Sequence, residues 1–470
     1  MNKTTFALFF GNRGFFPASL IAGAREEMKR TLNGLGHSVL MLDESATRYG
    51  AVETLQEGEV YANFLRAHRG EFGGVILCLP NFGDENGAVA ALKEAGVPIW
   101  VQAYPDDYDK MGPATRRDSF CGKLSIMDVF RQNGIQFTAL KPHTVRPGSE
   151  RFSANVDEFD RICQVVKGVK GMVVGAIGAR TTPFKTVRID EVALQKHGVT
   201  VETFDMSDVF HRMRSIKTDD AAYSTKVALL RDTAGWNGVP DRAFEQIVRL
   251  SMTLDQIIQE ASLDAIAIRC WSEIQVQMGI SPCVALGVLN EVGVAAACEV
   301  DLGNAVAMKA LHLASYEPVG LLDWNNNYYD EDDKCILFHC GPMPPSLMEG
   351  KGQITDHAIL LNAVGAGNGY GCNVGRIRPM DITFTSLMTD DGRVKVYLGE
   401  GRITNDPIPA NFFGVAGVAE IPHLQDVLLH VGVQGHRHHV SVTPGLLRKP
   451  LAEALGHYLG FAVAVPQLAV

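Results

Sequence analysis

Residues 295–315 have the sequence AAACEVDLGNAVAMKALHLAS, and the fold can be built outward from this stretch. The apolar run that ends at Cys298 is typical of a buried strand, and the segment from Leu302 onward is typical of a helix. A strand followed directly by a helix is the repeating unit of parallel α/β sheets. Such sheets bind ligands beyond the carboxyl ends of their strands. Glu299 and Asp301 follow this strand, so they lie where a binding site is expected.

The same alternation of strand and helix recurs over most of the chain. It predicts an N-terminal α/β domain over residues 1–165 and a second α/β domain over residues 166–344. After about residue 345, Gly, Pro and Thr increase and strands are separated by turns such as DDG, which predicts a β-rich domain over residues 345–470. We therefore expect an α/β fold with two Rossmann-like parallel-sheet domains, followed by an antiparallel, barrel-like C-terminal domain.

The composition is that of a globular protein. Of the 470 residues, 46% are hydrophobic and 20% are charged, and the formal net charge is −10. This charge argues against nucleic acid or an anionic membrane as a partner and leaves small polar substrates open. The nine cysteines form no CxxC pair and mostly lie in apolar runs, so we expect buried reduced thiols. We find neither a signal peptide pattern nor a membrane-spanning stretch, and expect a cytoplasmic protein.

Two acidic residues follow buried strands of the second α/β domain. Glu273 comes after AIAIRCWS, and Asp301 comes after GVAAAC with Glu299 two positions before it. Carboxylates in these positions can bind a ligand or take part in catalysis. Asp301 also precedes LGNAVAMKAL, where a carboxylate can cap the N-terminus of a helix. Both interpretations of Asp301 stay open at this point.

Histidines stand out at two places. His339 ends the apolar run CILFH, where an imidazole is either a hydrogen-bonded core residue or a ligand. GHRHHVSVTPG, residues 435–445, places His436, His438 and His439 within four positions. Alternate side chains of a strand face opposite ways, so we expect one of His438 and His439 to be a ligand, and not both. A solvent-facing basic turn is the alternative interpretation.

Two carboxylates and one or two imidazoles form a mixed oxygen and nitrogen donor set. Such a set suits a divalent ion, with Mn²⁺ as the first choice and Mg²⁺, Co²⁺ or Fe²⁺ as alternatives. It lacks the thiolates that favour structural zinc, although Cys340 stands next to His339.

Three basic residues lie close together after a strand of the second α/β domain. Arg180, Lys185 and Arg188 belong to the segment GARTTPFKTVR. They can hold an anionic group of a ligand, or they can form a solvated basic loop.

Taken in order, these motifs resemble those of the L-fucose isomerases. CEVDLGNAVAM resembles the strand-to-helix segment that supplies a metal-binding aspartate, which Asp301 matches. HHVSVTPG resembles the C-terminal segment that supplies a metal-binding histidine; His439 matches it, and His438 stands where an asparagine is usual. GNRGFFP and LCLPNFGDE resemble the substrate-facing N-terminal loops, with Arg13 as a sugar contact.

The resemblance extends to the L-arabinose isomerases, which use two glutamates and two histidines. These residues would correspond to Glu273, to Glu299 or Asp301, to His339 and to His439. The resemblance thus implies a metal-dependent aldose–ketose isomerase that acts on a monosaccharide through an enediolate. It also implies a homo-oligomer, a trimer or a hexamer.

Within this resemblance, Glu273 and Asp301 would transfer the protons and bind the metal together with His339 and His439. We expect Arg13, His438, Arg180 and Lys185 to contact the sugar. The spacing from Glu273 to Asp301 departs from the fucose isomerase pattern, so the sugar itself stays open. A sulfonated or acidic aldose such as sulfoquinovose, held by Arg180 or Lys185, is one alternative. A metal-dependent aldol lyase and a non-catalytic sugar-binding sensor are the others.

Overall fold

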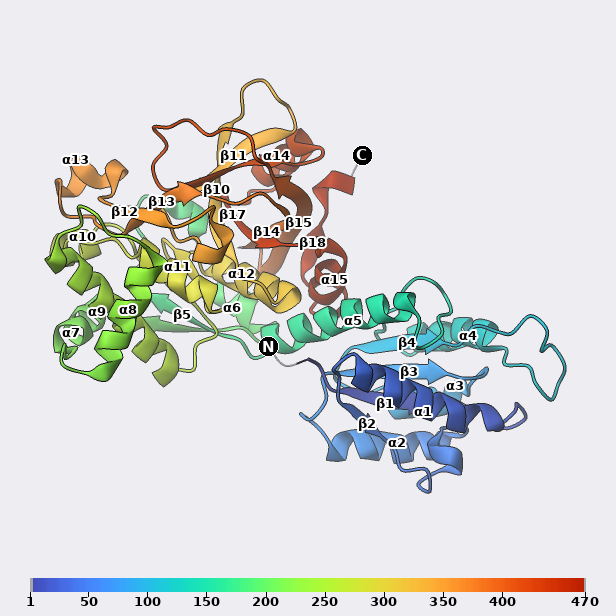
Figure 1. The fold of residues 1–470 in the computed structure, drawn as a ribbon. Coiled ribbons are helices and arrows are strands. Elements are labelled where there is room, and N and C mark those ends of the chain that lie inside the picture. Colours follow the sequence, from blue (N-terminus) through green and yellow to red (C-terminus); the bar gives the residue numbers. More distant parts are fainter. Residues whose placement is uncertain (1–2, 469–470) are drawn as a thin grey trace. The chain divides into compact units, whose positions relative to one another are not determined.

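The computed structural model describes residues 3–468, which fall into two units (Figure 1). Unit 1 consists of Met1–Lys167 and Glu453–Leu459, and unit 2 consists of Gly168–Ala452 and Gly460–Val470. Among the described residues, no helix has the length and apolar character that are needed to cross a membrane.

Unit 1 is built on a four-stranded parallel sheet. The strand order is β2-β1-β3-β4, so the chain changes direction across the sheet between β1 and β3. The strands are β1 (Phe6–Phe10), β2 (Val39–Met41), β3 (Gly74–Leu79) and β4 (Ile99–Ala103). The helices are α1 (Ser19–Gly34), α2 (Leu55–Ala67), α3 (Glu85–Leu92), α4 (Ser119–Gln132) and α5 (Glu150–Val169).

Both faces of this sheet are covered by helices. Val75 and Leu77 of β3 belong to a core with α2, α3 and α4, whereas Phe6 of β1 stacks on Phe159 of α5 at a centroid distance of 5.5 Å. Successive side chains of a strand face opposite ways, so a strand covered on both faces is apolar throughout. The sequence of β3, GVILCL, has this character.

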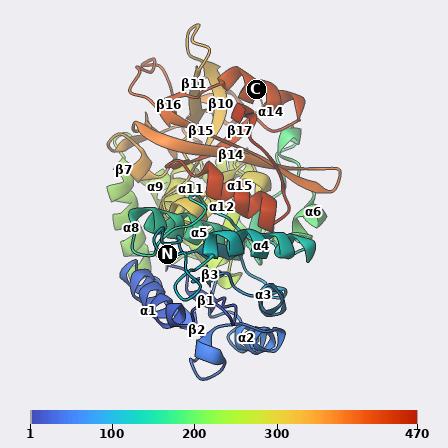
Figure 2. The same ribbon diagram turned by 90° about the vertical axis from the view of Figure 1, so that its right-hand side faces the viewer.

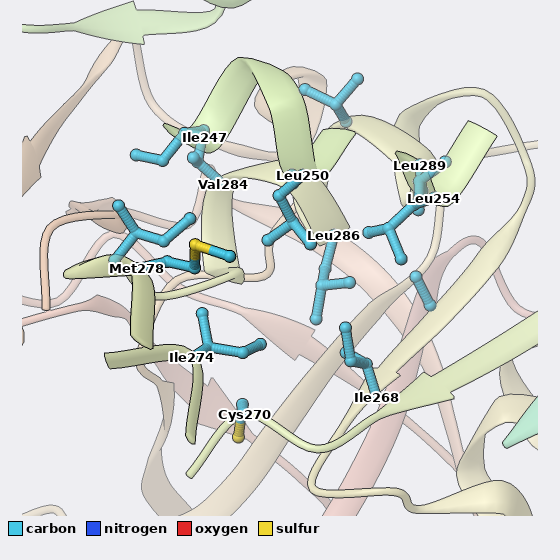
Figure 3. Close-up of a cluster of buried hydrophobic side chains, with 14 of the residues drawn as sticks. Ile247, Leu250, Leu254, Ile268, Cys270, Ile274, Met278, Val284, Leu286 and Leu289 are labelled. Atoms are coloured by element: carbon cyan, nitrogen blue, oxygen red, sulfur yellow. The ribbon is translucent and has the colours of Figure 1, made fainter. Parts of the chain in front are cut away.

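Unit 2 contains a second four-stranded parallel sheet, in the order β6-β5-β8-β9. Its strands are β5 (Val173–Ile177), β6 (Thr200–Phe204), β8 (Ala265–Ile268) and β9 (Ala295–Cys298). Its helices are α6 (Glu191–Gln195), α7 (Met206–Ser215), α8 (Ala221–Thr233), α9 (Asp241–Glu260), α10 (Glu273–Met278), α11 (Cys283–Glu291) and α12 (Leu302–Ser315). Ile268 packs with Leu250 and Leu254 of α9 and with Val284 and Leu286 of α11 in one buried cluster (Figure 3).

The rest of unit 2 is a ten-stranded, mostly antiparallel sheet. Its order is β18-β15-β14-β17-β10-β11-β16-β13-β12-β7, and β15 also pairs with β16, so the strands from β15 to β16 close into a barrel. The strands are β7 (Ala234–Gly235), β10 (Gly320–Asn327), β11 (Lys334–His339), β12 (Gly352–Thr355), β13 (Cys372–Arg376), β14 (Met380–Asp390), β15 (Arg393–Ile403), β16 (Val415–Glu420), β17 (His439–Pro444) and β18 (Ala462–Ala464). The helices α13 (Leu361–Val364), α14 (Leu424–Val433) and α15 (Arg448–Ala452) accompany them.

Helix α12 joins the two sheets of unit 2. It packs against β14 and β17 of the antiparallel sheet (Figure 2). It also packs against β8 and β9 of the parallel sheet. Apart from Lys309 and His312, all of its residues are buried. A helix that is apolar on every side requires cover on every side, and the sequence LGNAVAMKALHLAS meets that requirement only between two layers.

The fold class expected from the sequence is confirmed, with two parallel sheets and a β-rich, mostly antiparallel sheet. The strand and the helix expected within residues 295–315 are β9 and α12. The antiparallel sheet starts earlier than the sequence suggested, because β10 and β11 precede residue 345. The domain limits near residues 165 and 344 stay predictions. The nine cysteines are free, and seven of them are buried, as expected for reduced thiols.

Aromatic rings surround His436, just after α14. The His436 ring meets Tyr397 edge-on at a centroid distance of 4.8 Å and stacks on His430 at 5.8 Å. Trp324 donates from Nε1 to the Tyr397 hydroxyl at 3.1 Å. Burial lowers the pKa of His436 from 6.5 to about 3, and the positive charges of His430 and Arg437 act in the same direction. The folded state therefore keeps this ring neutral in mild acid.

We expect His436 to make the protein sensitive to acid between pH 6.5 and about 3. In this window the unfolded state binds a proton at His436 that the folded state does not bind, so stability falls as the pH falls. His436→Phe should flatten the decrease in the urea midpoint between pH 7 and pH 4.5, measured in EDTA. His211→Phe, at an exposed position of α7, is the matched control and should keep the wild-type slope. An unchanged slope in His436→Phe would contradict this account.

Candidate metal centre

The chain leaves β9 through two residues with left-handed backbone. Glu299 has φ 63° and Val300 has φ 59°. Non-glycine residues rarely adopt this conformation, and for a β-branched residue it is an outlier that costs on the order of 1–3 kcal/mol. Such strain persists only where the surrounding structure holds the residue in place. The turn puts the Glu299 side chain, 6% exposed, against His439.

Asp301 caps α12, and donors surround its carboxylate. Oδ1 accepts from Asn304 N at 3.1 Å and from the Arg437 guanidinium. Oδ2 accepts from Asn304 Nδ2 at 2.7 Å and from His439 Nδ1 at 2.8 Å. A carboxylate offers about four lone-pair sites, so these four bonds saturate Asp301. The capping interpretation is confirmed, and the carboxylate also orients His439.

His439 opens β17 and lies directly opposite Asp323 of the neighbouring strand β10. Residues that are directly opposite in an antiparallel pair have their side chains on the same face of the sheet. Two residues along β17, Ser441 donates to Asn304 Oδ1 at 2.8 Å, which fastens this face of the sheet to α12. The strand register thus brings an imidazole and a carboxylate to the first turn of α12, beside Asp301.

His439 Nε2 faces two carboxylates. It lies 2.8 Å from Glu299 Oε2 and 3.5 Å from Asp323 Oδ1. Because Nδ1 is hydrogen-bonded to Asp301, a neutral ring carries its proton on Nδ1 and presents a lone pair at Nε2. Within residues 3–468, none of these three facing atoms has a hydrogen-bond partner of good geometry. When the ring is neutral, its Nε2 lone pair and each nearby carboxylate oxygen repel unless a proton or another cation lies between them.

His339 adds a fourth buried atom without a partner. Its ring lies 5.7 Å from the His439 ring, and its Nε2 has no hydrogen-bond partner in the described part of the chain. Its Nδ1 accepts from the backbone N–H of Cys340 at 2.9 Å. A neutral ring whose Nδ1 accepts must carry its proton on Nε2. His339 is therefore arranged to donate a hydrogen bond into the site.

The charges of the site favour a cation at His439. Burial alone would raise the pKa of Glu299, but the positive charge of His439 holds this pKa below its ordinary value. Burial also opposes ionisation of Asp301, yet Arg437 and His439 hold its pKa well below the usual range. Burial would lower the pKa of His439, whereas Glu299 and Asp301 raise it well above its ordinary value. The carboxylates thus attract a positive charge to Nε2, whether from a proton or from a metal ion.

The residues present fit a divalent metal ion. Among the described residues, two groups of potential ligand atoms lie within 4.8 Å of one another, namely Glu299 with His438 and His439, and Asp323 with His339 and His439. His439 belongs to both groups, so Glu299 and Asp323 flank its Nε2. Adjacent ligands of an octahedral ion such as Mg²⁺ are about 3 Å apart, close to the two distances from Nε2. Carboxylate and imidazole donors without a thiolate suit Mn²⁺, Mg²⁺, Co²⁺ or Fe²⁺.

The structure does not bring Glu273 to this group. Glu273 is the first residue of α10, its side chain is 45% exposed, and its carboxylate pairs with Arg269 Nε at 2.6 Å. The strand before it, β8, is where the sequence predicted it. A helix begins at Glu273, however, and the side chain pairs with Arg269, four residues earlier in the same segment.

Arg13 lies in unit 1, in the loop after β1. Its guanidinium pairs with Glu85, donates from Nε to the Gly83 carbonyl at 2.8 Å and lies 4.3 Å from the Phe82 ring centroid. These contacts hold Arg13 between the loops that follow β1 and β3. A contact between Arg13 and a sugar stays a prediction.

His438 also approaches the site. Its Nε2 lies 3.7 Å from Asp323 Oδ1, and its side chain is 42% exposed. The expectation that only one of His438 and His439 faces the site is not met. The physical reason is that β17 begins at His439, so strand alternation does not govern His438. Its greater exposure makes His438 a candidate for contact with a bound molecule.

The basic loop between β5 and α6, residues 178–190, passes beside His438. The Phe184 ring lies 6.0 Å from the His438 ring and 5.0 Å from the Trp271 ring. Arg180 donates only to the carbonyl groups of Thr181 and Thr182, both at 3.2 Å. Among the described residues, neither Arg180 nor Lys185 has a carboxylate partner. The loop thus has two cations without a carboxylate partner in the described part of the chain, and its Phe184 lies beside His438.

The sequence analysis did not single out Asp323. The residue follows the apolar run GLL in β10, and an acid in such a strand is a usable signal. The run DEDD, which begins seven residues later, hides this signal among solvent-exposed acids. Asp323 lies beside His439 because β10 pairs with β17, and no local pattern reveals which distant strands pair. Glu299 entered the sequence analysis only as an alternative to Asp301.

Comparison with known proteins connects this geometry to a family. The family model "Fucose/sulfoquinovose isomerase, N-terminal domain" matches residues 7–170, and the model "L-fucose isomerase, C-terminal domain" matches residues 337–466. A solute-binding protein from Actinobacillus succinogenes, solved with bound D-allose, is 11% identical and covers 67% of this chain and 92% of its own. At a TM-score of 0.18 this likeness carries no argument.

Several relatives that match the chain are sulfoquinovose isomerases. A sulfoquinovose isomerase from Priestia aryabhattai is 21% identical over 468 residues, which cover 99% of this chain and 100% of that protein. A sulfoquinovose isomerase from Alkalicoccus urumqiensis is 24% identical over 267 residues, 55% of this chain and 57% of that protein, so this match spans less than two thirds of the relative. The family models at both ends and the full-length relative make this chain a divergent member of the fucose isomerase-like proteins and an aldose–ketose isomerase.

Proposed function

We propose that this protein uses a divalent metal ion to isomerise a sulfonated aldose of the sulfoquinovose type through an enediolate. The observation that carries the proposal is that His439 Nε2 lies near Glu299 Oε2 and near Asp323 Oδ1, while none of these three atoms has a hydrogen-bond partner among the described residues. The sulfonated substrate rests on the uncompensated cations of the loop 178–190 and on relatives named sulfoquinovose isomerase.

His439 is the proposed metal ligand that two groups share, with Glu299 and His438 in one group and Asp323 and His339 in the other. This assignment replaces Glu273, which pairs with Arg269, and Asp301, whose lone pairs are all used. A bound Mn²⁺, or another divalent ion of this class, would act as a Lewis acid that stabilises the negative charge of an enediolate. Asp301 acts through His439, whose Nδ1 it holds, so that Nε2 points to the two carboxylates.

Isomerisation moves a proton between C1 and C2 of the sugar and another proton between the two oxygens. Glu299 and Asp323 flank His439 from two sides, so the two carboxylates can serve the two ends of the reacting diol as base and acid. Glu299 as a whole residue is 5% exposed, so its burial keeps away water that would compete for the proton. His339 can donate from Nε2 to a sugar oxygen, because its Nδ1 is engaged by Cys340.

The loop 178–190 is the proposed site for the sulfonate. Arg180 and Lys185 supply positive charge without a carboxylate partner, and Phe184 carries the loop to within ring contact of His438. A sulfonate is a strong acid and stays ionised, so a guanidinium or ammonium group attracts it at every physiological pH. His438, partly exposed between the loop and Asp323, is placed to contact the sugar between its two ends.

Metal binding should depend on Glu299 and Asp323 and not on Glu273. Titration calorimetry of EDTA-stripped protein with MnCl₂ should show tight binding to the wild type and to Glu273→Gln. Binding to Glu299→Gln and Asp323→Asn should be at least about 10-fold weaker, because each amide removes a negative oxygen ligand. Glu273→Gln is the matched control because it makes the same carboxylate-to-amide change at a residue that pairs with Arg269. Loss of Mn²⁺ affinity in Glu273→Gln alone would contradict the assignment.

Turnover should follow the same residues. NMR in D₂O of the Mn²⁺-loaded protein with sulfoquinovose should show a ketose of unchanged carbon skeleton with deuterium at the reacting carbon. Glu299→Gln and Asp323→Asn should lower kcat by about 10²- to 10⁴-fold, the usual contribution of a general acid or base. Two carbonyl fragments would indicate an aldol lyase, binding without product would indicate a sugar sensor, and full retention of hydrogen would indicate hydride transfer.

Arg180 and Lys185 should determine the preference for a sulfonated sugar. The double variant Arg180→Gln with Lys185→Gln should raise KM for sulfoquinovose by at least about 10-fold and leave kcat within a few-fold, because it removes charge attraction distant from the reacting carbons. Lys217→Gln, an exposed lysine that follows α7, is the matched control and should leave both constants unchanged. Equal losses for sulfoquinovose and an unsulfonated aldose would overturn the sulfonate assignment.

A further inference from the structure

Four buried cysteines from four separate segments form a row of thiols, which the proposed reaction does not use. The Cys283 sulfur accepts hydrogen bonds from Cys298 and from Cys372, and Cys298 is also within hydrogen-bond contact of Cys270. Cys270 and Cys298 belong to the buried cluster of which Figure 3 shows a part. A free cysteine in a core usually packs as a small apolar side chain, so thiols that contact one another call for a chemical reason.

The topology explains why Cys283 and Cys298 meet. Helix α11 begins at Cys283, and the next strand, β9, ends at Cys298. The nine residues of α11 span about 13 Å, and the four residues of β9 span nearly the same distance in the opposite direction. The start of the helix therefore lies beside the end of the strand. The Val284 N–H donates to the Gly371 carbonyl at 3.0 Å, which brings the start of α11 beside Cys372 as well.

Cys283 is the nucleophile of this row. The hydrogen bonds from Cys298 and Cys372 hold the pKa of Cys283 well below its ordinary value, although burial opposes ionisation. The positive end of the α11 dipole favours a negative charge at the first residue of the helix in the same way. A thiolate is thus held between two thiols, and the thiolate is the form of cysteine that reacts with oxidants.

We propose that Cys283 and Cys298 are a peroxide-sensitive pair, which closes a disulfide that displaces the turn at Glu299. Cys298 donates the stronger of the two hydrogen bonds to Cys283, so it is the thiol that completes the reaction. It also stands directly before Glu299 in the chain. The effect on function rests on the proposed metal centre, in which Glu299 is grouped with His438 and His439, whereas the disulfide itself does not.

The reaction oxidises two thiols and reduces one molecule of hydrogen peroxide. The Cys283 thiolate attacks one peroxide oxygen, so an S–O bond forms and the O–O bond breaks. The second oxygen leaves as hydroxide and takes up the proton that the thiol had released, which gives water and a sulfenic acid. The Cys298 sulfur then displaces the sulfenic hydroxyl group. An S–S bond replaces the S–O bond, and the departing hydroxide takes the Cys298 proton to form a second water.

The disulfide should act on the metal centre through the turn after β9. It draws the two sulfur atoms to about 2.05 Å, far inside van der Waals contact. Eight of the nine residues of α11 are buried, which holds the helix firmly, whereas the turn already contains two residues of positive φ. The displacement therefore falls on Cys298 and Glu299. It moves the Glu299 carboxylate out of its 2.8 Å contact with His439.

Burial selects the oxidant. Cys283 is 2% exposed and Cys298 is 1% exposed, so a bulky reagent such as oxidised glutathione does not reach them. Hydrogen peroxide is little larger than water. Cys340 is partly exposed next to His339, and it lies close enough to Cys283 for the two thiolates to repel each other. This side of the metal centre is therefore the route by which peroxide reaches the pair.

The test uses the full chain after EDTA treatment, with Cys121→Ala in every variant to remove the exposed thiol. Peroxide treatment is stopped with catalase, free thiols are alkylated in denaturant, and peptides are mapped by mass spectrometry. The parent chain should yield a linked Cys283–Cys298 peptide, which oxidised glutathione does not produce. Calorimetry of the oxidised parent should show Mn²⁺ affinity at least about 10-fold weaker, as is usual when the surroundings of a ligand are disturbed, and dithiothreitol should restore it.

Three single variants locate the effect. Cys298→Ala should keep its Mn²⁺ affinity after peroxide, because the disulfide cannot form. Cys372→Ala should still form the disulfide and lose affinity like the parent. Cys335→Ala, the matched control, removes a buried thiol outside the row and should also respond like the parent.

Each outcome supports or overturns a defined part of the proposal. A linked Cys283–Cys372 peptide would overturn the role of Cys298, and recovery of Cys283 as a free thiol would overturn the reactive pair. Unchanged Mn²⁺ affinity in the chain that carries the Cys283–Cys298 disulfide would overturn the effect on the turn. If the reduced parent bound no Mn²⁺, the metal-dependent function would be overturned, whereas the mapped disulfide would still confirm the pair.

Discussion

The hydrogen bond from His439 Nδ1 to Asp301 Oδ2, at 2.8 Å, is the interaction on which the rest of the site depends. It joins the first residue of β17 to the N-cap of α12, where the antiparallel sheet of unit 2 meets the parallel sheet. It also decides which ring nitrogen faces Glu299 and Asp323. The two interpretations of Asp301 that the sequence leaves open, helix cap and functional carboxylate, are thus compatible, because different lone pairs serve the two tasks.

The other groups are held by backbone constraints of different kinds. Asp323 is placed by strand register, since β10 and β17 pair Asp323 directly with His439. Glu299 is placed by a strained turn, in which two consecutive non-glycine residues adopt positive φ. A relaxed turn would let the chain pass from β9 into α12 without directing Glu299 toward the imidazole. The strain is therefore consistent with a site whose geometry is held by the surrounding fold.

Much of the fold follows from local sequence patterns, whereas much of the site does not. The apolar runs of β3 and β9 and the mostly apolar helix α12 have a direct signature, because burial on every side leaves few polar positions. Asp301 and His439 are found from position alone, one beyond a buried strand and one in a dense histidine segment. Asp323 is not found, since its role depends on pairing with a distant strand. Glu273 follows a buried strand just as Glu299 does, but a helix begins at Glu273. The local pattern does not reveal which of the two glutamates lies against His439.

Opposite charges lie at two places around the start of β17. Near His439, carboxylates outnumber cations. Arg437 pairs with Asp301 and compensates the charge of that carboxylate alone. On the far side of His438, the loop 178–190 carries cations that have no carboxylate partner among the described residues. If the two groups were free to meet, they would neutralise each other. In the structure, the contact between the rings of Phe184 and His438, 6.0 Å apart, links this loop to the start of β17. The proposed substrate, a sulfonated aldose bound to a divalent ion, would bring a cation to the carboxylates and an anionic group to the loop.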